Sequence, residues 1–136
     1  MAAGVVQVTA GAIARGGRVL VCQRPPGGHH AGKWEFPGGK VEAGESLEAG
    51  LRRELQEELG IEATIGRILW RTEHQYTGRA RFALTFFLVK QYEGEPINRA
   101  LAAMVWAPPA ELHTFDFLDA DRAFVAALSC GEVGLD

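Results

Sequence analysis

Cysteine is scarce in this chain, and the sequence also lacks long apolar runs and a secretion signal. Only Cys22 and Cys130 occur among the 136 residues, and Cys22 lies in an apolar segment that suits a buried thiol. Two distant cysteines favour a reducing compartment. No run of about 18 apolar residues is present, and no basic segment followed by an apolar one opens the chain. We therefore predict a cytoplasmic protein without membrane contacts.

Basic residues do not outnumber acidic ones, which argues against a surface for nucleic-acid polymers. The chain has 14 basic and 17 acidic residues and a net charge of −3. Zinc is not expected, because His29 and His30 lie in a glycine-rich loop without Cys or Asp at ligand spacing. With no repeat, low-complexity segment or linker, residues 1–136 are expected to form one domain. No sequence pattern indicates an oligomeric state.

The stretch from Gly38 to Ile61 organises the rest of the chain. Its glycine-rich start predicts a loop whose backbone can approach a ligand closely. Ser46 is a favourable N-cap residue and Gly60 a favourable residue just past a helix end, so we expect a helix between them. At about 100° per residue, four leucines of this helix form one apolar arc. They are Leu47, Leu51, Leu55 and Leu59.

A neighbouring arc of the helix carries Glu54, Glu57 and Glu58. Like charges at these spacings repel by about 0.2–0.5 kcal/mol per pair, and partial burial makes an unpaired carboxylate costlier. A divalent cation would remove this conflict, because Mg²⁺ is usually held by carboxylates together with substrate phosphates. A solvated acidic face is the alternative interpretation. Three carboxylates beside a glycine loop suit metal-assisted phosphoryl chemistry, in which a carboxylate also accepts the proton of the attacking water.

The spacing around these carboxylates matches a known pattern. Gly39 is followed after five residues by Glu45 and, after seven more, by the run from Arg53 to Ile61. This fills every fixed position of G-x5-E-x7-R-E-U-x-E-E-x-G-U, where U is a bulky aliphatic residue. The pattern is the signature of the Nudix hydrolases, with the box at residues 39–61, and the chain resembles their MutT type. Shorter similarities to MutT cover residues 23–24, 33–40, 92–96 and 119–122.

The resemblance implies a divalent cation, Mg²⁺ with Mn²⁺ as an alternative, bound by Glu54, Glu57 and Glu58. The backbone carbonyl of Gly38 joins this set on the resemblance alone. Glu54 is the first choice for the general base and Glu57 the second. Arg53 is expected to orient a glutamate through a bidentate ion pair.

Glu45 is placed to close the glycine loop onto the helix. It can do so by a salt bridge or through a water bound to the metal. A purely structural pairing with Arg53 is the alternative interpretation.

The resemblance also implies a nucleotide substrate. Nudix enzymes hydrolyse a nucleoside diphosphate linked to another moiety. The MutT type converts a nucleoside triphosphate, often an oxidised one such as 8-oxo-dGTP, to a monophosphate and pyrophosphate, which cleanses the nucleotide pool. The substrate-binding positions expected by similarity are Arg24, Phe36, Gly39, Lys40, Asp119 and Asp121. Three of them also have a purely structural alternative to substrate binding. Arg24 could be a surface arginine, Phe36 a core residue and Asp119 a helix N-cap.

Two departures from MutT bear on the substrate. Asp121 stands where MutT has an asparagine that reads the purine edge. A carboxylate accepts hydrogen bonds and donates one only when protonated, so it can hold the N–H groups of guanine or the N4 amino group of cytosine. The segment from Asn98 to Leu101 has no carboxylate where MutT has a glutamate. This favours Glu54 as the base and weakens the specific assignment to 8-oxo-dGTP.

Apolar segments and turn residues predict an α/β (α+β) fold with the order β-β-α-β-β-β-α. A Gly16-Gly17 hairpin is expected to join the first two strands. The resemblance implies the Nudix fold, an α/β/α sandwich with a mixed sheet between helices. The expected strands are 5–14, 19–23, 63–74, 80–90 and 100–107, with turns at 75–78 and 92–96 and a last helix at 119–130.

Other functions stay open on the sequence alone. ADP-ribose hydrolysis is a second enzymatic hypothesis, as is hydrolysis of dinucleoside polyphosphates, for which Tyr76 gives weak support. A nucleotide sensor without catalytic activity is a third, although such modules usually lose carboxylates that this chain keeps. Arg79 and Arg81 could meet phosphates, and a solvated strand end is the alternative.

Overall fold

The computed structural model describes residues 4–76, 78 and 80–136 of the chain. Its main sheet is mixed and follows the order β3-β2-β1-β7-β6, with β4 paired to β1 and β9 paired to β2. The strands are β1 (Val5–Arg15), β2 (Arg18–Gln23), β3 (Trp34–Glu35), β4 (Gly38–Lys40), β6 (Ile68–Gln75), β7 (Arg81–Val89) and β9 (Ala103–Ala107). A separate ribbon pairs β5 (Glu62–Thr64) with β8 (Gln91–Glu93).

Strand β1 is the centre of the sheet. It runs parallel to β7, from the pair Val5 and Arg81 to the pair Ile13 and Val89, and antiparallel to β2 and β4. The expected hairpin between β1 and β2 is confirmed. Gly16 and Gly17 have φ angles of 58° and 78°, which is the backbone that a tight two-residue hairpin requires.

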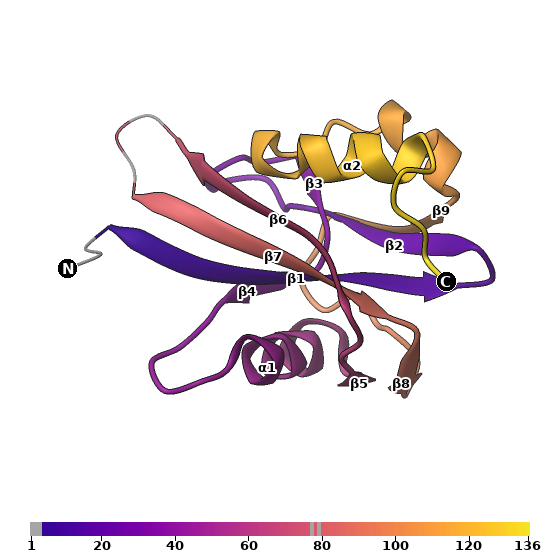
Figure 1. Ribbon diagram of the computed structural model, residues 1–136, viewed down its shortest axis with the longest axis horizontal. Helices are drawn as coiled ribbons and strands as arrows, with labels where there is room; N and C mark the ends of the chain where they lie inside the picture. The colour runs from indigo at the N-terminus through magenta and orange to yellow at the C-terminus, as the bar shows by residue number, and fades with distance from the viewer. Residues whose placement is uncertain (1–3, 77, 79) are drawn as a thin grey trace.

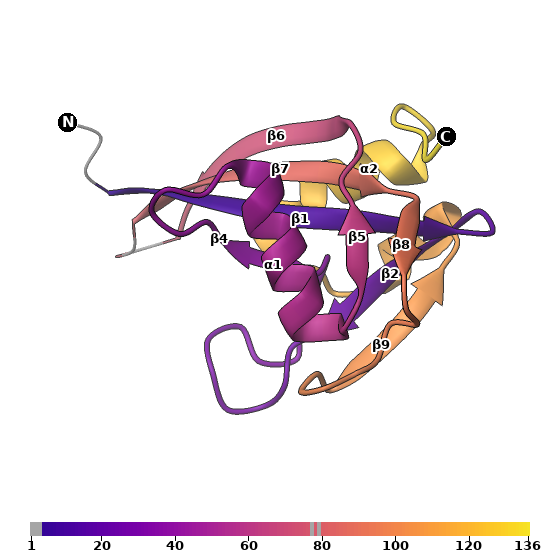
Figure 2. The ribbon, with the colours of Figure 1, turned by 90° about the horizontal axis from the view of Figure 1, so that it is seen from below.

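Helix α1 (Leu47–Leu59) covers one face of the sheet and α2 (Arg122–Ser129) the other (Figure 1). Seen from below, α1 lies across the middle of β1 (Figure 2). Side chains that alternate along β1 and β2 divide the core into two layers, because successive residues of a strand point to opposite faces. Ala10 and Ala12 pack in the layer of α2, whereas Ile13 and Leu20 pack with the leucines of α1. The predicted α/β/α arrangement is confirmed.

The limits of α1 agree with the sequence signals. The Ser46 side chain accepts a hydrogen bond from Ala49 N at 3.0 Å, and Gly60 adopts the left-handed conformation that ends the helix. Leu51, Leu55 and Leu59 are buried. Within the described residues, no helix is long and apolar enough to cross a membrane.

Several predicted elements differ from the structure. The strand expected at 63–74 is two strands, β5 and β6, separated by a close backbone approach at Gly66. A Cβ at Gly66 would lie 2.7 Å from the carbonyl oxygen of Leu88. The turn expected at 92–96 begins inside β8, which pairs with β5. Strand β4 forms where we expected a loop, because it pairs with β1. Strand β3 forms in a segment for which no strand was predicted, because it pairs with β2.

The last helix begins later than predicted. Residues Asp119–Asp121 form a 3-10 turn, η2, and the α-helix starts at Arg122. Neither Asp119 nor Asp121 caps a helix through its side chain, so the N-cap interpretation of Asp119 is wrong. A second 3-10 helix, η1 (Pro109–Thr114), follows β9.

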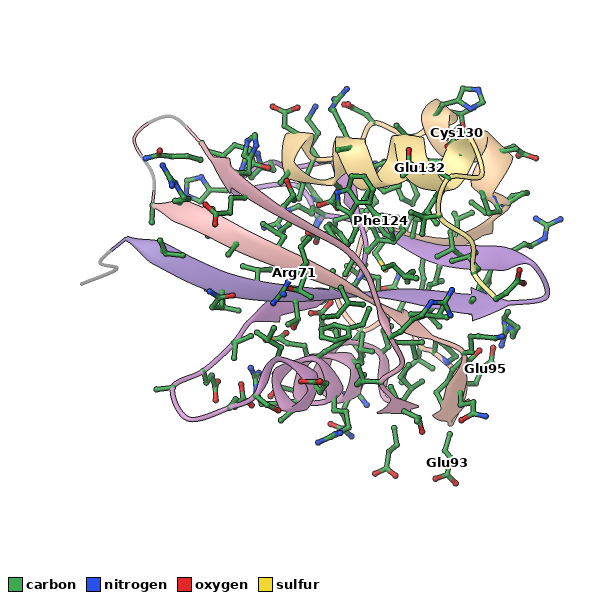
Figure 3. The ribbon with its side chains drawn as sticks, viewed as in Figure 1. Arg71, Glu93, Glu95, Phe124, Cys130 and Glu132 are labelled. Atoms are coloured by element: carbon green, nitrogen blue, oxygen red, sulfur yellow. The ribbon has the colours of Figure 1, made fainter. Side chains whose placement is uncertain are left out.

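Phe124 attaches α2 to the sheet (Figure 3). It is fully buried, and its ring centroid lies 4.4 Å from that of Phe86 and 5.2 Å from that of Phe36. Asp121 is close to Phe124 along the chain, and Phe36 packs against the Phe124 ring. Phe124 therefore also holds α2 against the segment that contains Phe36 and leads into the glycine loop.

We expect Phe124→Ala to lower the free energy of unfolding by about 3–5 kcal/mol, since it removes a buried aromatic ring and leaves a cavity. Urea denaturation followed by circular dichroism measures this change. Glu132→Ala, at an exposed position of the C-terminal segment, is the matched control and should stay within about 0.5 kcal/mol of the parent. A loss below about 1 kcal/mol for Phe124→Ala would contradict the packing described.

Candidate active site

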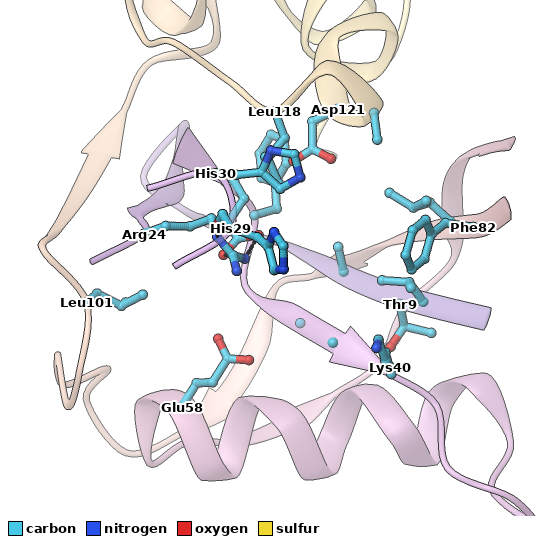
Figure 4. A pocket seen from close by; sticks show the side chains of 18 of the residues that line it. Thr9, Arg24, His29, His30, Lys40, Glu58, Phe82, Leu101, Leu118 and Asp121 are labelled. Carbon is cyan, nitrogen blue, oxygen red and sulfur yellow. Dashed lines mark hydrogen bonds and ion pairs between the residues drawn. The ribbon is translucent and has the colours of Figure 1, made fainter. Parts of the chain in front are cut away.

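A cleft of about 710 Å³ reaches from α1 to η2 (Figure 4). Glu57 and Glu58 of α1 line one end, together with Gly38, Gly39 and Lys40 of β4. Apolar side chains of β1 and β7, among them Phe82, form a wall, and Asp121 lies at the other end. One continuous cavity therefore joins a carboxylate-rich end to an apolar end with a single buried carboxyl.

The two glycines of β4 allow the backbone of β1, the backbone of β4 and the side chain of Glu54 to pack closely at the carboxylate end of the cleft. A Cβ at Gly38 would lie 2.0 Å from the carbonyl oxygen of Thr9. A Cβ at Gly39 would lie 2.5 Å from the carboxyl carbon of Glu54. Side chains at either position would push β4 away from β1 or displace Glu54, so both positions require glycine.

Arg53 gathers the charged residues of this end. Its Nε and Nη2 donate to the two carboxylate oxygens of Glu45 at 2.8 and 3.0 Å, which is the bidentate pair that we predicted. Its Nη1 donates to Glu54 at 3.0 Å and to Glu57 at 3.2 Å. Nη2 also donates to the carbonyl oxygen of Lys40 at 3.0 Å. The hydrogen bond from Arg53 lowers the pKa of Glu45, so Glu45 ties the glycine loop to α1 as a charged group.

Glu58 faces the cleft (Figure 4). Burial raises the pKa of Glu58 to about 9, and both the hydrogen bond that its protonated form donates to Glu54 and the charge of Glu54 add to the rise. A backbone hydrogen bond from Gly38 acts in the opposite direction. No ion pair to Glu58 occurs within the described residues, and its surroundings are partly desolvated.

Three glutamates of α1 were predicted to form a metal cluster, and they do not form one in advance. Among the described residues, no group of three His, Cys, Asp or Glu side chains is set to hold a metal ion. Glu54 and Glu57 form ion pairs with Arg53, and Glu58 is hydrogen-bonded to Glu54. The donor set nevertheless fits a hard divalent cation, because it offers carboxylate oxygens in a place where Glu58 is costly to ionise alone.

Arg24 closes the loop between β2 and β3. Its Nη1 contacts both carboxylate oxygens of Glu35 at 3.1 and 3.2 Å, and its Nε donates to the carbonyl oxygen of His29 at 3.1 Å. The pKa of Glu35 is raised by burial, and the charge of Arg24 limits that rise. Arg24 therefore lines the cleft as part of an ion pair, and the interpretation as a plain surface arginine does not hold. Whether it also binds a nucleotide stays a prediction.

Phe36 and Asp121 lie together at the apolar end. Phe36 belongs to the buried core, stacked on Phe117 with centroids 5.4 Å apart, and it also lines the cleft. Asp121 is 4% exposed. Burial raises the pKa of Asp121 to about 8, the charge of Glu35 adds to the rise, and a hydrogen bond from the Phe36 backbone opposes it.

Asp119 does not belong to this group. Its exposed carboxylate pairs with Arg122 at 3.1 Å, and it is not among the residues that line the cleft. Its position gives no support to the prediction that it binds substrate. Arg81 pairs with Glu73 in an exposed place, and Arg79 lies outside the described residues.

Two residues reach the cleft through contacts between distant segments. Arg99 lines it and donates to the carbonyl oxygens of Gln56 and Glu57 at 3.3 and 3.0 Å, so it stabilises the C-terminal end of α1. Tyr76, which gave weak support to a dinucleoside polyphosphate substrate, packs against the His30 ring, with centroids 4.6 Å apart, and accepts a hydrogen bond from Ala120 N. His29 and His30 also line the cleft.

Comparisons with known proteins agree on one family. The family model described as NUDIX domain matches residues 2–128. The chain is 43% identical over 122 residues to a Mycobacterium tuberculosis protein named provisionally as 8-oxo-dGTP diphosphatase 2, covering 90% of this chain and 86% of that one. It is 39% identical over 123 residues to the CTP pyrophosphohydrolase of Escherichia coli, covering 90% of each. A solved structure from work on MutT of Aliivibrio salmonicida and Vibrio cholerae superposes with a TM-score of 0.79 at 32% identity, covering 93% of this chain and 98% of that chain.

Replacement of Asp121 by Asn should change the pH dependence of stability. The folded-state pKa of Asp121, about 8, lies above the ordinary value of 3.8, so between these values the folded protein retains a proton that the unfolded chain loses. Stability from this group is present at low pH and is lost as the pH rises from about 4 to about 8. Asp121→Asn should therefore gain stability relative to the parent over this interval, by at most about 1.4 kcal/mol per pH unit. Chemical denaturation at pH 5, 6, 7 and 8 measures the difference, and a constant difference would refute the assignment.

Proposed function

The chain belongs to the Nudix hydrolase family, and we propose that it hydrolyses a nucleoside triphosphate to a nucleoside monophosphate and pyrophosphate with Mg²⁺. Mn²⁺ is the alternative cation for the same site. The observation that supports this most is one continuous cleft, with the carboxylates of α1 at one end and the buried Asp121 at the other. Its volume of about 710 Å³ and its two chemically different ends suit a charged phosphate chain attached to a flat base. Such an activity on oxidised or modified nucleotides would cleanse the nucleotide pool.

Glu54, Glu57, Glu58 and the Gly38 carbonyl are the groups that we propose for the metal. A divalent cation there would neutralise the phosphate charges and acidify a water molecule. Glu54 is half-buried next to Gly39, so its orientation is restricted and it suits the role of general base. Glu57 is more exposed and is the second choice.

We propose that two further sets of residues position the carboxylates and the substrate. Arg53 and Glu45 hold β4 and its loop on α1, so they fix the distance between the carboxylates and the phosphate chain. Lys40 and the backbone of Gly39 border the cleft beside these carboxylates, and we propose that they contact phosphate. Arg24 and Phe36 would border the nucleoside.

Asp121 favours a base that presents amino hydrogens. Burial raises the pKa of Asp121 to about 8, and a hydrogen bond donated by a bound base favours its ionised form. The carboxylate then only accepts hydrogen bonds, and the N4 amino group of cytosine supplies the donor. The similarity to a CTP pyrophosphohydrolase agrees with a cytosine nucleotide. The N1–H and N2–H₂ groups of guanine are the alternative, in line with the relative named for 8-oxo-dGTP.

A product-release screen with Mg²⁺ tests the reaction. It covers ordinary and oxidised deoxynucleoside triphosphates, CTP and 5-substituted cytosine nucleotides, ADP-ribose and diadenosine polyphosphates. Release of pyrophosphate from a triphosphate supports the proposal. Turnover of ADP-ribose or dinucleotides alone would overturn it, and tight binding without turnover of any compound would favour a sensor.

We expect Glu54→Gln to reduce kcat by roughly 10²–10⁴-fold, because an amide cannot accept the proton of the attacking water. Glu57→Gln should cost at least about tenfold. Glu48→Gln, on the exposed first turn of the same helix, is the matched control and should retain the parent activity. Pyrophosphate release under saturating substrate measures all three variants. If Glu57→Gln is the more damaging change, the two roles are exchanged.

We expect Asp121→Asn to lower the ratio of kcat/KM for CTP to that for GTP by roughly ten- to a hundredfold. The neutral amide is a weaker acceptor for the cytosine N4 amino group than a carboxylate, and its added donor can meet the O6 acceptor of guanine. Asp119→Asn should leave the ratio unchanged, since Asp119 lies outside the cleft. Competition between the two nucleotides in one reaction gives the ratio directly. An unchanged ratio in Asp121→Asn would mean that another residue selects the base.

A further inference from the structure

Thr9 carries a buried hydroxyl that no described residue engages. The residue lies in the middle of β1 and has no exposed surface. Its Oγ1 has no hydrogen-bond partner in the described part of the structure. A buried donor without a partner is costly, and a valine of the same shape would avoid this cost.

The surroundings of Thr9 place this hydroxyl next to Glu54. Thr9 is the cross-strand partner of Gly39, and directly opposed residues of antiparallel strands have Cβ positions roughly 4.5–5.5 Å apart on the same face of the sheet. The Cβ position of Gly39 lies 2.5 Å from the Glu54 carboxyl carbon and 2.7 Å from each carboxylate oxygen. Thr9 therefore points toward α1 from β1, on the side of the sheet where the Glu54 carboxylate lies.

The Glu54 carboxylate is paired with Arg53 and not with Thr9. Its Oε2 accepts from Arg53 at 3.0 Å, which holds the carboxylate toward the loop that Arg53 organises. A carboxylate that turns from Arg53 toward the cleft would need another donor on the sheet side. Thr9 is a hydroxyl donor on that side.

We propose that Thr9 is a positioning residue, whose hydroxyl donates to the Glu54 carboxylate when Glu54 engages a divalent cation and substrate. This inference rests on the proposed function of Glu54. It explains why this hydroxyl is kept in a largely apolar layer, since its partner is supplied by the loaded site. Thr9 lines the cleft, and in this inference it acts through Glu54 and not by contact with substrate or metal.

Two variants separate the hydroxyl from the shape of the side chain. Thr9→Val should raise the Tm of the metal-free protein by roughly 2–6 °C, because an unpartnered donor is removed. The same variant should lose about ten- to a hundredfold in kcat with KM for the nucleotide within about twofold, and Mg²⁺ should raise its Tm less than it raises that of the parent. Thr9→Ser keeps the hydroxyl and should retain kcat and the Mg²⁺-dependent rise in Tm.

Thr85→Val is the matched control. Thr85 is buried in β7 opposite Thr9, on the side away from β4, and its replacement should leave kcat unchanged. A Thr9→Val protein with parent kcat would overturn the inference, as would a lower metal-free Tm, which would reveal a structural partner. Equal losses in Thr9→Val and Thr9→Ser would also overturn it. Glu54→Gln is measured in parallel: full activity there defeats the proposed role of Glu54 itself, whereas an inactive Glu54→Gln beside a fully active Thr9→Val defeats only the role of Thr9.

Discussion

The repulsion between carboxylates on one helix is the constraint on which this site depends. Arg53 forms ion pairs with Glu45, Glu54 and Glu57, and burial together with Glu54 raises the pKa of Glu58 to about 9. One guanidinium does not neutralise these carboxylates, so a divalent cation would relieve the remaining repulsion. Binding of a cation would compete with Arg53 for Glu54 and Glu57, and protonation of Glu58 would oppose it, so metal affinity and pH are linked in this site.

Local signals explain which parts of the structure the sequence predicts well. The ends of α1 follow from Ser46 and Gly60, and the first hairpin follows from two adjacent glycines. The ion pair between Arg53 and Glu45 follows from spacing within one motif. Each of these features depends on residues that are close along the chain, so a pattern is sufficient to predict it.

Features built from distant segments were predicted poorly. The break at Gly66 arises from the backbone of Leu88, and the short β3 and β4 exist only because longer strands pair with them. The burial of Asp121, the exposure of Asp119 and the presence of Arg99 in the cleft are likewise results of packing. The conflict among the glutamates was foreseen, but the sequence does not indicate that Arg53 pairs with Glu54 and Glu57 as well as with Glu45.

The parallel pairing of β1 with β7 has a consequence for how the protein is made. Strand β1 gains a neighbour on its second edge only after residues 81–89 have been synthesised. Helix α1 and the part of the sheet beneath it are therefore synthesised long before β7 can pair with β1. Contacts of such long sequence separation slow folding and leave strand edges open during synthesis. A ribosome-bound chain that ends before β7 would therefore present β1 as an unprotected edge, and a chaperone or rapid elongation would have its greatest effect in this interval.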